Sequence, residues 1–321
     1  MGRLDGRVAI VTGAGRGIGR AHARLLADEG AHVVVNDLGA KPGADAQSVV
    51  DEIADSGGTA VADTGSATWA GAAGIVGRAL DAFGRVDILI NNATAGGNDD
   101  LWRFSEDEWD RTLAVNLSGY FAMTRAVVPA MARQHAGVIV NTSSQSGFGH
   151  PSHVAYASAK EGVLGLTRTT AKEVGRFGIR CNAIRPLALG PGVAEYHEHT
   201  VQWRELMDLT MGKGTKALDP EVFGAERIAP FVVWLCTDAA AEVNGRTFFV
   251  SGDRVALMTE PKTQAAITRE GGWTLDALDE VAPTELVDGL TNRFTLDDRP
   301  DLQEFPELQE FPELPDEAAP A

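Results

Sequence analysis

Short runs of apolar residues alternate along the chain with longer segments of helical character. The short runs are rich in β-branched residues and several end in glycine or a polar residue, which is typical of buried strands. They predict seven strands, at Val8–Val11, His32–Asn36, Ala60–Asp63, Val86–Asn91, Val138–Thr142, Ile179–Ile184 and Thr247–Val250. The intervening segments predict helices at Ile18–Glu29, Ala44–Ser56, Ala67–Phe83, Glu106–Gln134, Ala155–Phe177 and Ala225–Thr237.

This order of elements determines the fold that we expect. Alternating strands and helices form a parallel sheet with helices on both faces, so we predict a single doubly wound, Rossmann-like α/β domain with seven parallel strands. The length of 321 residues would fit two domains, but no linker precedes residue 258, and residues 1–258 are predicted to be one domain. Residues 187–224 follow the sixth strand and are predicted to form a substrate lid, because long connections at this edge of the sheet usually cover a substrate.

The C-terminal part of the chain has a different pattern. Residues 259–296 predict a helical extension, and residues 297–321 form an acidic tail with nine carboxylates and one arginine. Apolar residues recur in the tail at every third position, at Leu302, Phe305, Leu308, Phe311 and Leu314. Three is the period of polyproline II, so the tail is either a strip that docks on its own or a neighbouring subunit, or a disordered acidic segment.

Composition excludes several classes of function. The chain has 45 acidic and 28 basic residues, a net charge of −17, and such a chain repels phosphate, so we expect neither nucleic-acid nor anionic-membrane binding. No apolar stretch approaches the ~18 residues of a membrane span. Two cysteines, Cys181 and Cys236, indicate a reducing compartment, and we expect a cytoplasmic protein. His197-Glu198-His199 lacks metal-ligand spacing, and no metal is expected.

A glycine-rich loop joins the first strand to the first helix. Its sequence is Thr12-Gly13-Ala14-Gly15-Arg16-Gly17-Ile18-Gly19. Glycines at such a turn let the backbone approach a pyrophosphate, and the free amides at the helix N-terminus attract it. Because the loop lies between a strand and a helix, it predicts a dinucleotide site.

Asp37 ends the second strand, 24 residues after Gly13. A carboxylate there can accept both ribose hydroxyls of the adenosine and repels a 2′-phosphate, which favours NAD over NADP. Arg16 argues in the other direction, because a guanidinium beside the loop could bind that phosphate. The alternative for Asp37 is a cap of the following turn. Asp63 and Thr64 end the third strand, where the adenine edge would lie, and are otherwise turn formers.

Tyr156 and Lys160 stand one helical turn apart, so their side chains share a helix face. A nearby ammonium favours the phenolate and lowers the pKa of a phenol that is otherwise near ~10, although a surface pair is the alternative. The serine loop, residues 141–147, ends the fifth strand at the same sheet edge and offers hydroxyls to a substrate oxygen. Asn116 stands within the long helix, where it serves either a kink or a water of a proton relay.

The order of these motifs resembles the short-chain dehydrogenase/reductase family over about residues 6–258. The matching motifs are the glycine loop, Asn91-Asn92-Ala93, Asn116, the serine loop and Tyr156-x3-Lys160. The resemblance implies that Tyr156 is the acid/base, that Lys160 lowers its pKa and holds the nicotinamide ribose, and that Asn116 anchors the water relay. The usual spacing before the tyrosine selects Ser143, whereas the pattern Ser144-Gln145-Ser146-Gly147 selects Ser144, which we favour.

The resemblance also implies the residues that bind the cofactor. They are Gly13, Arg16, Gly17, Ile18, Gly19, Asp37, Leu38, Asp63, Thr64, Asn91, Ala93, Tyr156, Lys160, Pro186 and Leu189. Two places depart from the family pattern. Thr94 replaces the glycine of N-N-A-G, and Pro186-Leu187-Ala188-Leu189 stands where the family has P-G, near the nicotinamide.

Three further segments concern the substrate. Residues 34–39, 229–236 and 271–273 resemble the (3R)-hydroxyacyl-CoA dehydrogenase domain of multifunctional enzymes, whereas residues 94–97 and 152–155 do not. The resemblance implies an NAD(H)-dependent oxidoreductase of lipid metabolism that interconverts a secondary alcohol and a ketone, with a hydroxyacyl-CoA or hydroxysteroid substrate. It also implies a homotetramer built through the fourth and fifth helices.

Two alternatives stay open. Thr94 and the missing Pro-Gly motif are compatible with a dinucleotide-binding sensor or scaffold that has lost turnover. His150 and His153, between the serine loop and Tyr156, either line the pocket or are ordinary loop residues.

Overall fold

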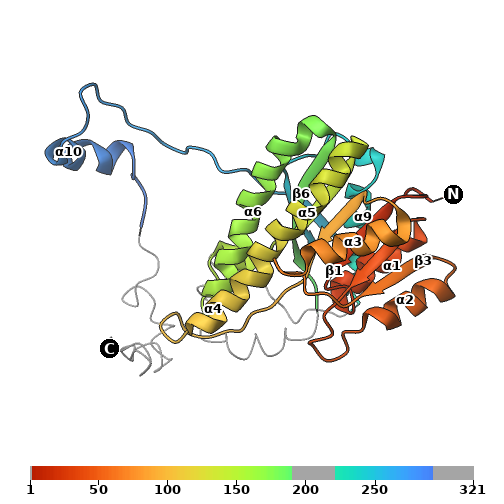
Figure 1. Ribbon diagram of the computed structural model, residues 1–321. Coiled ribbons are helices and arrows are strands. Elements are labelled where there is room, and N and C mark those ends of the chain that lie inside the picture. Colours follow the sequence, from red (N-terminus) through yellow and green to blue (C-terminus); the bar gives the residue numbers. More distant parts are fainter. Residues whose placement is uncertain (1, 190–220, 292–321) are drawn as a thin grey trace. The chain divides into compact units, whose positions relative to one another are not determined.

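The structure, a computed structural model, describes residues 2–189 and 221–291, and the chain divides after Met258 into two compact units. The first unit contains an eight-stranded sheet in the order β3-β2-β1-β4-β5-β6-β7-β8 (Figure 1). The strands are β1 Val8–Thr12, β2 His32–Asn36, β3 Thr59–Asp63, β4 Ile88–Asn91, β5 Gly137–Thr142, β6 Ile179–Leu187, β7 Thr247–Ser251 and β8 Arg254–Leu257. The predicted α/β class and doubly wound sheet are confirmed, but the predicted number of seven strands is one too low.

The additional strand, β8, is antiparallel to β7, whereas all the other neighbours are parallel. Ser251 pairs with Arg254, so only Gly252 and Asp253 connect the two strands. Gly252 has a φ of +51°, which suits glycine in a tight hairpin turn. The strand is short and three of its four residues are exposed, so it lacks the buried apolar run that identifies the other strands.

Alternate residues of the central strands face two different helical layers. Ala9 and Val11 pack with one set of helices, and Val8 and Ile10 pack with the other. The first layer contains α1 Gly17–Asp28, α2 Ala46–Asp55 and α9 Ala229–Leu235. The second contains α3 Ala72–Phe83, α5 Gly119–Gln134 and α6 Val154–Val174. Because both sheet faces are covered, the strands are apolar throughout rather than alternating.

The predicted helix Glu106–Gln134 has an irregular centre. It consists of α4 Glu106–Leu113, a π-helical turn η1 Ala114–Ser118, and α5. A π-helical turn adds one residue to the winding, which apolar periodicity does not reveal. Several other boundaries also differ from the prediction. Among them, α3 begins at Ala72, β6 extends to Leu187, and residues 225–237 divide into a 3₁₀ turn, Ala225–Arg227, and α9.

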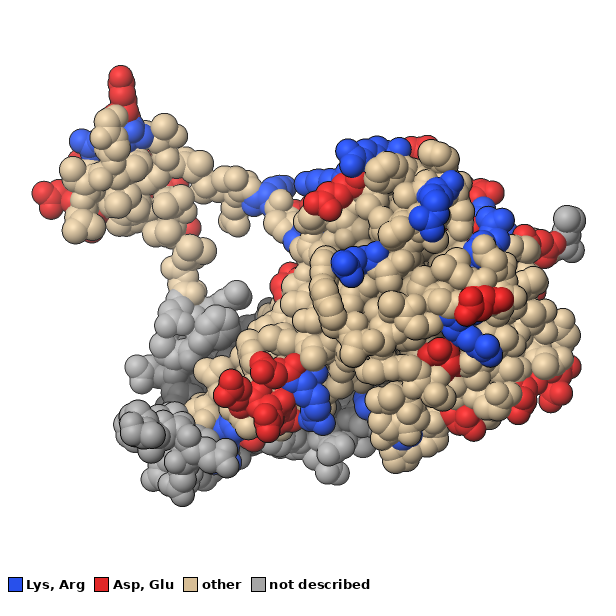
Figure 2. Space-filling view, in the orientation of Figure 1, with Lys and Arg blue, Asp and Glu red and all other residues tan. Residues whose placement is uncertain are grey.

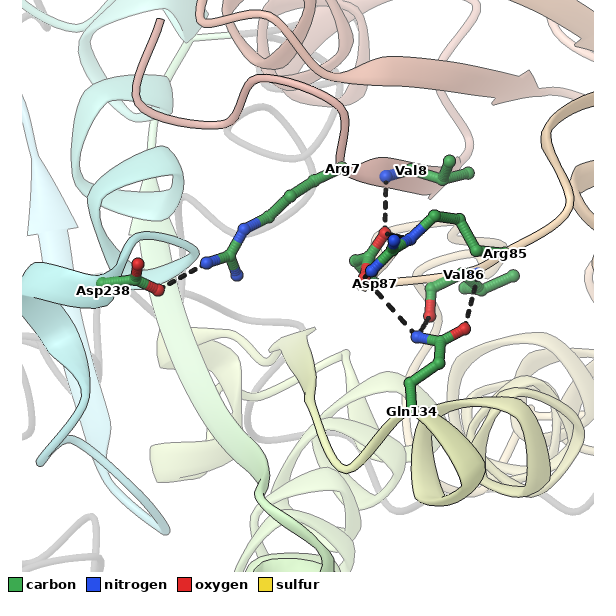
Figure 3. Close-up of polar contacts among 7 residues, drawn as sticks. All are labelled: Arg7, Val8, Arg85, Val86, Asp87, Gln134 and Asp238. Carbon is green, nitrogen blue, oxygen red and sulfur yellow. Dashed lines mark hydrogen bonds and ion pairs between the residues drawn. The ribbon is translucent and has the colours of Figure 1, made fainter.

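A polar cluster lies at the amino ends of β1 and β4 (Figure 3). Asp87 is buried, accepts from the Val8 amide at 2.9 Å and is paired with Arg85, whose Nη2 lies 2.7 Å from Oδ1. Gln134, at the end of α5, donates to the carbonyl of Val86 at 2.8 Å. Arg7 pairs with Asp238 in the same view. These contacts tie the strand starts together at the edge opposite to the carboxyl ends.

The second unit contains one helix among its described residues, α10 Leu275–Glu285. Thr274 caps it by accepting from the Ala277 amide at 3.3 Å. Residues 190–220 of the predicted lid and the predicted strip in residues 297–321 lie outside the described residues. None of the described helices is long and apolar enough to cross a membrane.

Candidate active site

The glycine loop turns between β1 and α1 at the carboxyl edge of the sheet. Gly13 has a φ of +63°, and a Cβ there would lie 2.7 Å from the Ala93 Cα, so only glycine fits. Gly17, the first residue of α1, has a φ of +56° and nothing within 4 Å of an added Cβ. Arg16 makes no side-chain cap and the first turn of α1 holds no acidic residue. The helix N-terminus therefore offers open amides to an anion, which fits a pyrophosphate.

Asp37 lies directly beside this loop. Its Oδ2 accepts from the Gly15 amide at 3.0 Å and its Oδ1 from the Gly39 amide at 2.9 Å. The carboxylate therefore stands at the end of β2 next to the expected pyrophosphate, where adenosine ribose hydroxyls would meet it. These contacts also make Asp37 a turn cap, so the two roles considered for it are compatible.

Two cations accompany Asp37. Arg16 donates to the carbonyl of Pro42 at 3.0 Å, and Lys41 donates to the carbonyl of Thr94 at 3.0 Å. Burial and the Arg16 charge lower the pKa of Lys41, whereas Asp37 raises it. Lys41 is absent from the predicted site. The signal that could have identified it is its position as a lysine in the loop that follows Asp37.

The remaining predicted cofactor residues divide into structural and surface positions. The Asn91 amide is buried and donates to Asn141 at 2.9 Å, so it links β4 to β5. Asn92, which was not predicted, donates to the carbonyls of Thr12 and Gly13 and holds the glycine loop.

Asp63 accepts from the side-chain amide of Asn36 at 2.8 Å and from the main-chain amide of Gly65, which is a turn-forming role. Leu38 and Thr64 are exposed, and Ile18 is half-buried. The half-buried Pro186 lies in β6, opposite Val250 of β7.

Tyr156 lies in the first turn of α6 and is hydrogen-bonded to the side chains of Thr94 and Ser144. Burial raises the pKa of the phenol above its ordinary value, and these two hydrogen bonds act in the opposite direction. The ring of His153 lies 5.3 Å from the Tyr156 ring, between centroids. The phenol thus stands among hydroxyl groups from two different loops.

Lys160 is buried one turn further along α6. Its Nζ donates to the Tyr120 hydroxyl at 3.0 Å and to the Thr142 carbonyl at 2.9 Å, and it lies 5.4 Å from the centre of the Tyr156 ring. Burial, with a smaller effect of Lys41, lowers the pKa of Lys160 to about 7. The structure brings the predicted pair together, and it adds Tyr120, which was not predicted, as a partner of the ammonium.

The two candidate serines have different surroundings. Ser143 is buried and donates to the carbonyl of Lys160 at 2.7 Å. Ser144 is hydrogen-bonded to Tyr156, and its Oγ also accepts from the Ser146 amide at 3.1 Å. Of the two hydroxyls, that of Ser144 faces the phenol.

The buried guanidinium of Arg185 braces the serine loop. It contacts the carbonyl of Ser144 and the carboxylate of Glu161, and it lies 4.1 Å from the centre of the Phe148 ring. The main chain of the serine loop is therefore held from β6.

Asn116 lies in the π-helical turn η1. Its Nδ2 donates to the carbonyl of Ala95 at 2.5 Å and to that of Thr112 at 2.8 Å. Its Oδ1 accepts from the Thr94 hydroxyl at 2.8 Å. The amide therefore joins the irregular helix centre to the loop that follows β4.

The two loop histidines both lie beside Ser146. His150 Nδ1 and His153 Nδ1 are each 3.3 Å from Ser146 Oγ. Burial lowers the pKa of His150 to about 4, so this ring is neutral at neutral pH. Among the described residues, no group of three or more histidine, cysteine, aspartate or glutamate side chains is arranged to hold a metal ion.

Comparison with known proteins gives consistent matches. The family model for short chain dehydrogenases matches residues 7–201. Peroxisomal multifunctional enzyme type 2 of Mus musculus is 40% identical to this chain, over 84% of this chain and 35% of its own length. Hydroxyacyl-CoA dehydrogenase ChsB1 of Mycobacterium tuberculosis is 36% identical, over 91% of this chain and 89% of its own length. A short chain dehydrogenase from Mycobacterium avium, known from its crystal structure, aligns with a TM-score of 0.75 at 36% identity, over 89% of this chain and 96% of that one. The chain spans about a third of the length of the multifunctional enzymes that it matches.

Proposed function

Since this chain belongs to the short-chain dehydrogenase family and is an oxidoreductase of CH–OH groups, we propose that it interconverts a 3-hydroxyacyl-CoA and the corresponding ketone with NAD(H). The observation that carries the proposal is the contact of Ser144 with Tyr156, one helical turn before Lys160 and at the sheet edge that bears the glycine loop. The relative named hydroxyacyl-CoA dehydrogenase ChsB1 supports the thioester class, because an acyl-CoA is a thioester. An acyl-CoA substrate would place the reaction in lipid metabolism.

The proposed mechanism uses Tyr156 and Ser144 on one substrate oxygen. In oxidation, the Tyr156 phenolate accepts the hydroxyl proton, and Ser144 donates a hydrogen bond to the oxygen as negative charge develops. A nicotinamide dinucleotide held by the glycine loop would supply the hydride-transfer chemistry in either direction. Lys160, with a pKa of about 7, carries a positive charge on part of the molecules at neutral pH and favours the phenolate.

The residues proposed to hold the cofactor come from the carboxyl ends of β1 and β2 and from α6. The amides of the glycine loop would face the pyrophosphate, Asp37 would accept from the adenosine ribose, and Lys160 would donate to the nicotinamide ribose. Asp37 supports NAD, because its carboxylate repels a 2′-phosphate. Arg16 and Lys41 lie close enough to oppose this preference, so Asp37 is the group to test.

Nicotinamide absorbance with a panel of 3-hydroxyacyl-CoAs and hydroxysteroids tests the reaction, with NAD and NADP compared for each. We expect turnover of the thioesters with NAD, and Asp37→Asn should lower the NAD:NADP ratio of kcat/KM by about tenfold. Tyr156→Phe is the matched control, because it keeps the ring and removes the proton-transferring oxygen. If wild type and Tyr156→Phe bind NAD equally and neither turns over any substrate, the sensor function would be favoured instead.

We also propose a homo-oligomer, with α5 in its interface. Trp69 and Phe121 are exposed and stacked, with ring centroids 5.6 Å apart, and Arg125 lies over the Trp69 ring. Figure 2 shows acidic residues gathered over α4, whose first turn contains Glu106, Asp107 and Glu108. Exposed aromatic rings of this kind, with an arginine over one of them, support a protein interface. The two free, buried cysteines support a reducing, cytoplasmic location.

A further inference from the structure

Thr94 connects two parts of the active site that are distant in sequence. It follows β4, at the position where the family pattern has glycine. Its hydroxyl donates to Asn116 Oδ1 at 2.8 Å, and the same side chain, as a hydrogen-bonding neighbour, lowers the pKa of the Tyr156 phenol. One small side chain therefore bridges the π-helical turn and the first turn of α6.

The acceptor on Asn116 has a defined orientation. Both protons of its Nδ2 are used, on the carbonyls of Ala95 and Thr112, so the amide oxygen points at Thr94. Asn116 is buried, so water does not compete for this oxygen.

The main chain around Thr94 is also held. The Thr94 carbonyl accepts from Lys41 at 3.0 Å, and the Ala93 amide donates to the Thr12 hydroxyl at 3.0 Å. The Thr94 hydroxyl is consequently placed by fixed groups on both sides.

A hydroxyl has one proton and can donate to only one of its two neighbours at a time. While the phenol is protonated, its own O–H can donate to Thr94, which leaves the threonine proton for Asn116. Once the phenol loses its proton, the phenolate becomes the stronger acceptor, because hydrogen bonds to ionised oxygens are stronger than neutral ones.

We propose that Thr94 is a positioning residue of the acid/base centre, whose hydroxyl donates to Asn116 while Tyr156 is protonated and turns to the Tyr156 oxygen when the phenolate forms. The inference rests on the proposed function of Tyr156 as acid/base. It assigns to Thr94 the stabilisation of the phenolate, in addition to Ser144 and Lys160.

Other titratable groups surround the phenol, and Thr94 variants leave them in place. Lys160 and His153 lie on or beside α6, Tyr120 comes from α5, and Lys41 acts on Lys160 from the loop after β2. Thr94→Ser keeps the hydroxyl, and Thr94→Val replaces the hydroxyl by a methyl group of similar size. A change in the Tyr156 titration that occurs in Thr94→Val and not in Thr94→Ser is therefore assigned to the hydroxyl.

The test uses a readout that needs no substrate. The chain has three tyrosines, so incorporation of difluorotyrosine gives three fluorine NMR signals, and Tyr156→Phe identifies the relevant one. Fluorination brings the phenol titration into a range between about pH 6 and pH 10, where proteins remain folded. We expect Thr94→Val to raise the Tyr156 midpoint by about one pH unit, and Thr94→Ser to change it by less than about 0.3.

Equal Tyr156 midpoints in wild type and Thr94→Val would overturn the inference. Thr94→Ala serves as the second variant if Thr94→Val does not fold, with the melting temperature measured for each. With an active substrate, Thr94→Val should lower kcat at pH 7 by about tenfold, and kcat should recover at higher pH. Absence of turnover in wild type would count against the proposed function alone, because the titration reports on Thr94 independently.

Discussion

The ammonium of Lys160 donates to the hydroxyl of Tyr120, 3.0 Å away. That hydroxyl donates onward to the carbonyl of Ala93 at 3.2 Å, so it connects the lysine to the loop after β4. Burial raises the pKa of Tyr120 well above its ordinary value, and the phenol stays neutral. Tyr120 therefore orients the Lys160 ammonium without cancelling its charge.

Tyr120→Phe tests this relationship. In the structure, the Lys160 Nζ lies 4.6 Å from the centre of the Tyr120 ring. Phenylalanine keeps a ring at this position but removes the oxygen that accepts from the ammonium. Loss of a partner of the charged form should lower the pKa of Lys160 below about 7. We expect kcat at pH 7 to fall about tenfold, as one lost buried hydrogen bond would produce. An unchanged pH profile of kcat would show that Tyr120 is only a packing residue.

The two serines should respond differently to alanine. Ser144→Ala removes the donor to the substrate oxygen, and we expect kcat to fall about 100- to 1,000-fold with KM little changed. Ser143→Ala removes a bond to the Lys160 carbonyl and should lower stability by about 1 kcal/mol with a smaller effect on kcat. Steady-state kinetics and urea melts of both variants separate the two roles. The opposite ranking of kcat would identify Ser143 as the reacting serine.

His22 makes stability depend on pH. It is fully buried in α1, neither ring nitrogen has a partner in the described parts of the chain, and burial lowers its pKa from 6.5 to about 3. Because the unfolded chain binds the proton more readily, this contribution to stability is complete above pH 6.5 and is lost as the pH falls towards 3.

Between pH 7 and pH 5 the loss from His22 should be about 2 kcal/mol. His22→Leu removes this contribution, so the difference between urea midpoints at the two pH values should shrink. An equally large difference in His22→Leu would mean that other groups, such as His150, determine the acid sensitivity.

Asp87 should matter for stability and not for catalysis. It holds the Val8 amide and Arg85 at the sheet edge opposite to Tyr156 (Figure 3). Asp87→Ala leaves a buried amide and a half-exposed guanidinium without their acceptor, and we expect a loss of about 2 kcal/mol in the free energy of unfolding. Arg85→Met, which keeps the carboxylate on the amide, is the matched control and should cost less. A large fall in kcat under conditions where the variant is fully folded would contradict this assignment.

Most of the sheet could be predicted from sequence because of how parallel strands are buried. Strands such as Val8–Thr12 are covered on both faces, so each is a continuous apolar run that differs from its polar surroundings. β8 lacks that covering and was not predicted, although Gly252-Asp253 is a hairpin signal. The π-helical turn around Asn116 was also hidden, since one added residue leaves the apolar pattern on either side intact.

The candidate site was predictable where residue type and spacing carry the chemistry. Tyr156 and Lys160 are one helical turn apart, and the glycine loop stands between a strand and a helix, so local rules place them. Roles that depend on which hydroxyl meets which acceptor did not follow from local rules, and the two patterns in the sequence selected different serines although Ser144 was favoured. Ser143 and Ser144 are adjacent in sequence. Only the path of the chain after β5 turns the Ser143 hydroxyl towards the Lys160 carbonyl and the Ser144 hydroxyl towards the Tyr156 phenol.

The sequence by itself determined the fold class, the alternation of strands and helices along the chain, the dinucleotide loop and the tyrosine–lysine pair, because each follows from periodicity or from local spacing. Only the tertiary structure decided the partners of those groups. Lys41, Thr94 and Tyr120 come from three separate segments and meet near Lys160 and Tyr156 because the carboxyl ends of parallel strands converge at one edge of the sheet. Contacts between distant segments depend on the packing of the whole domain, and no local pattern contains them.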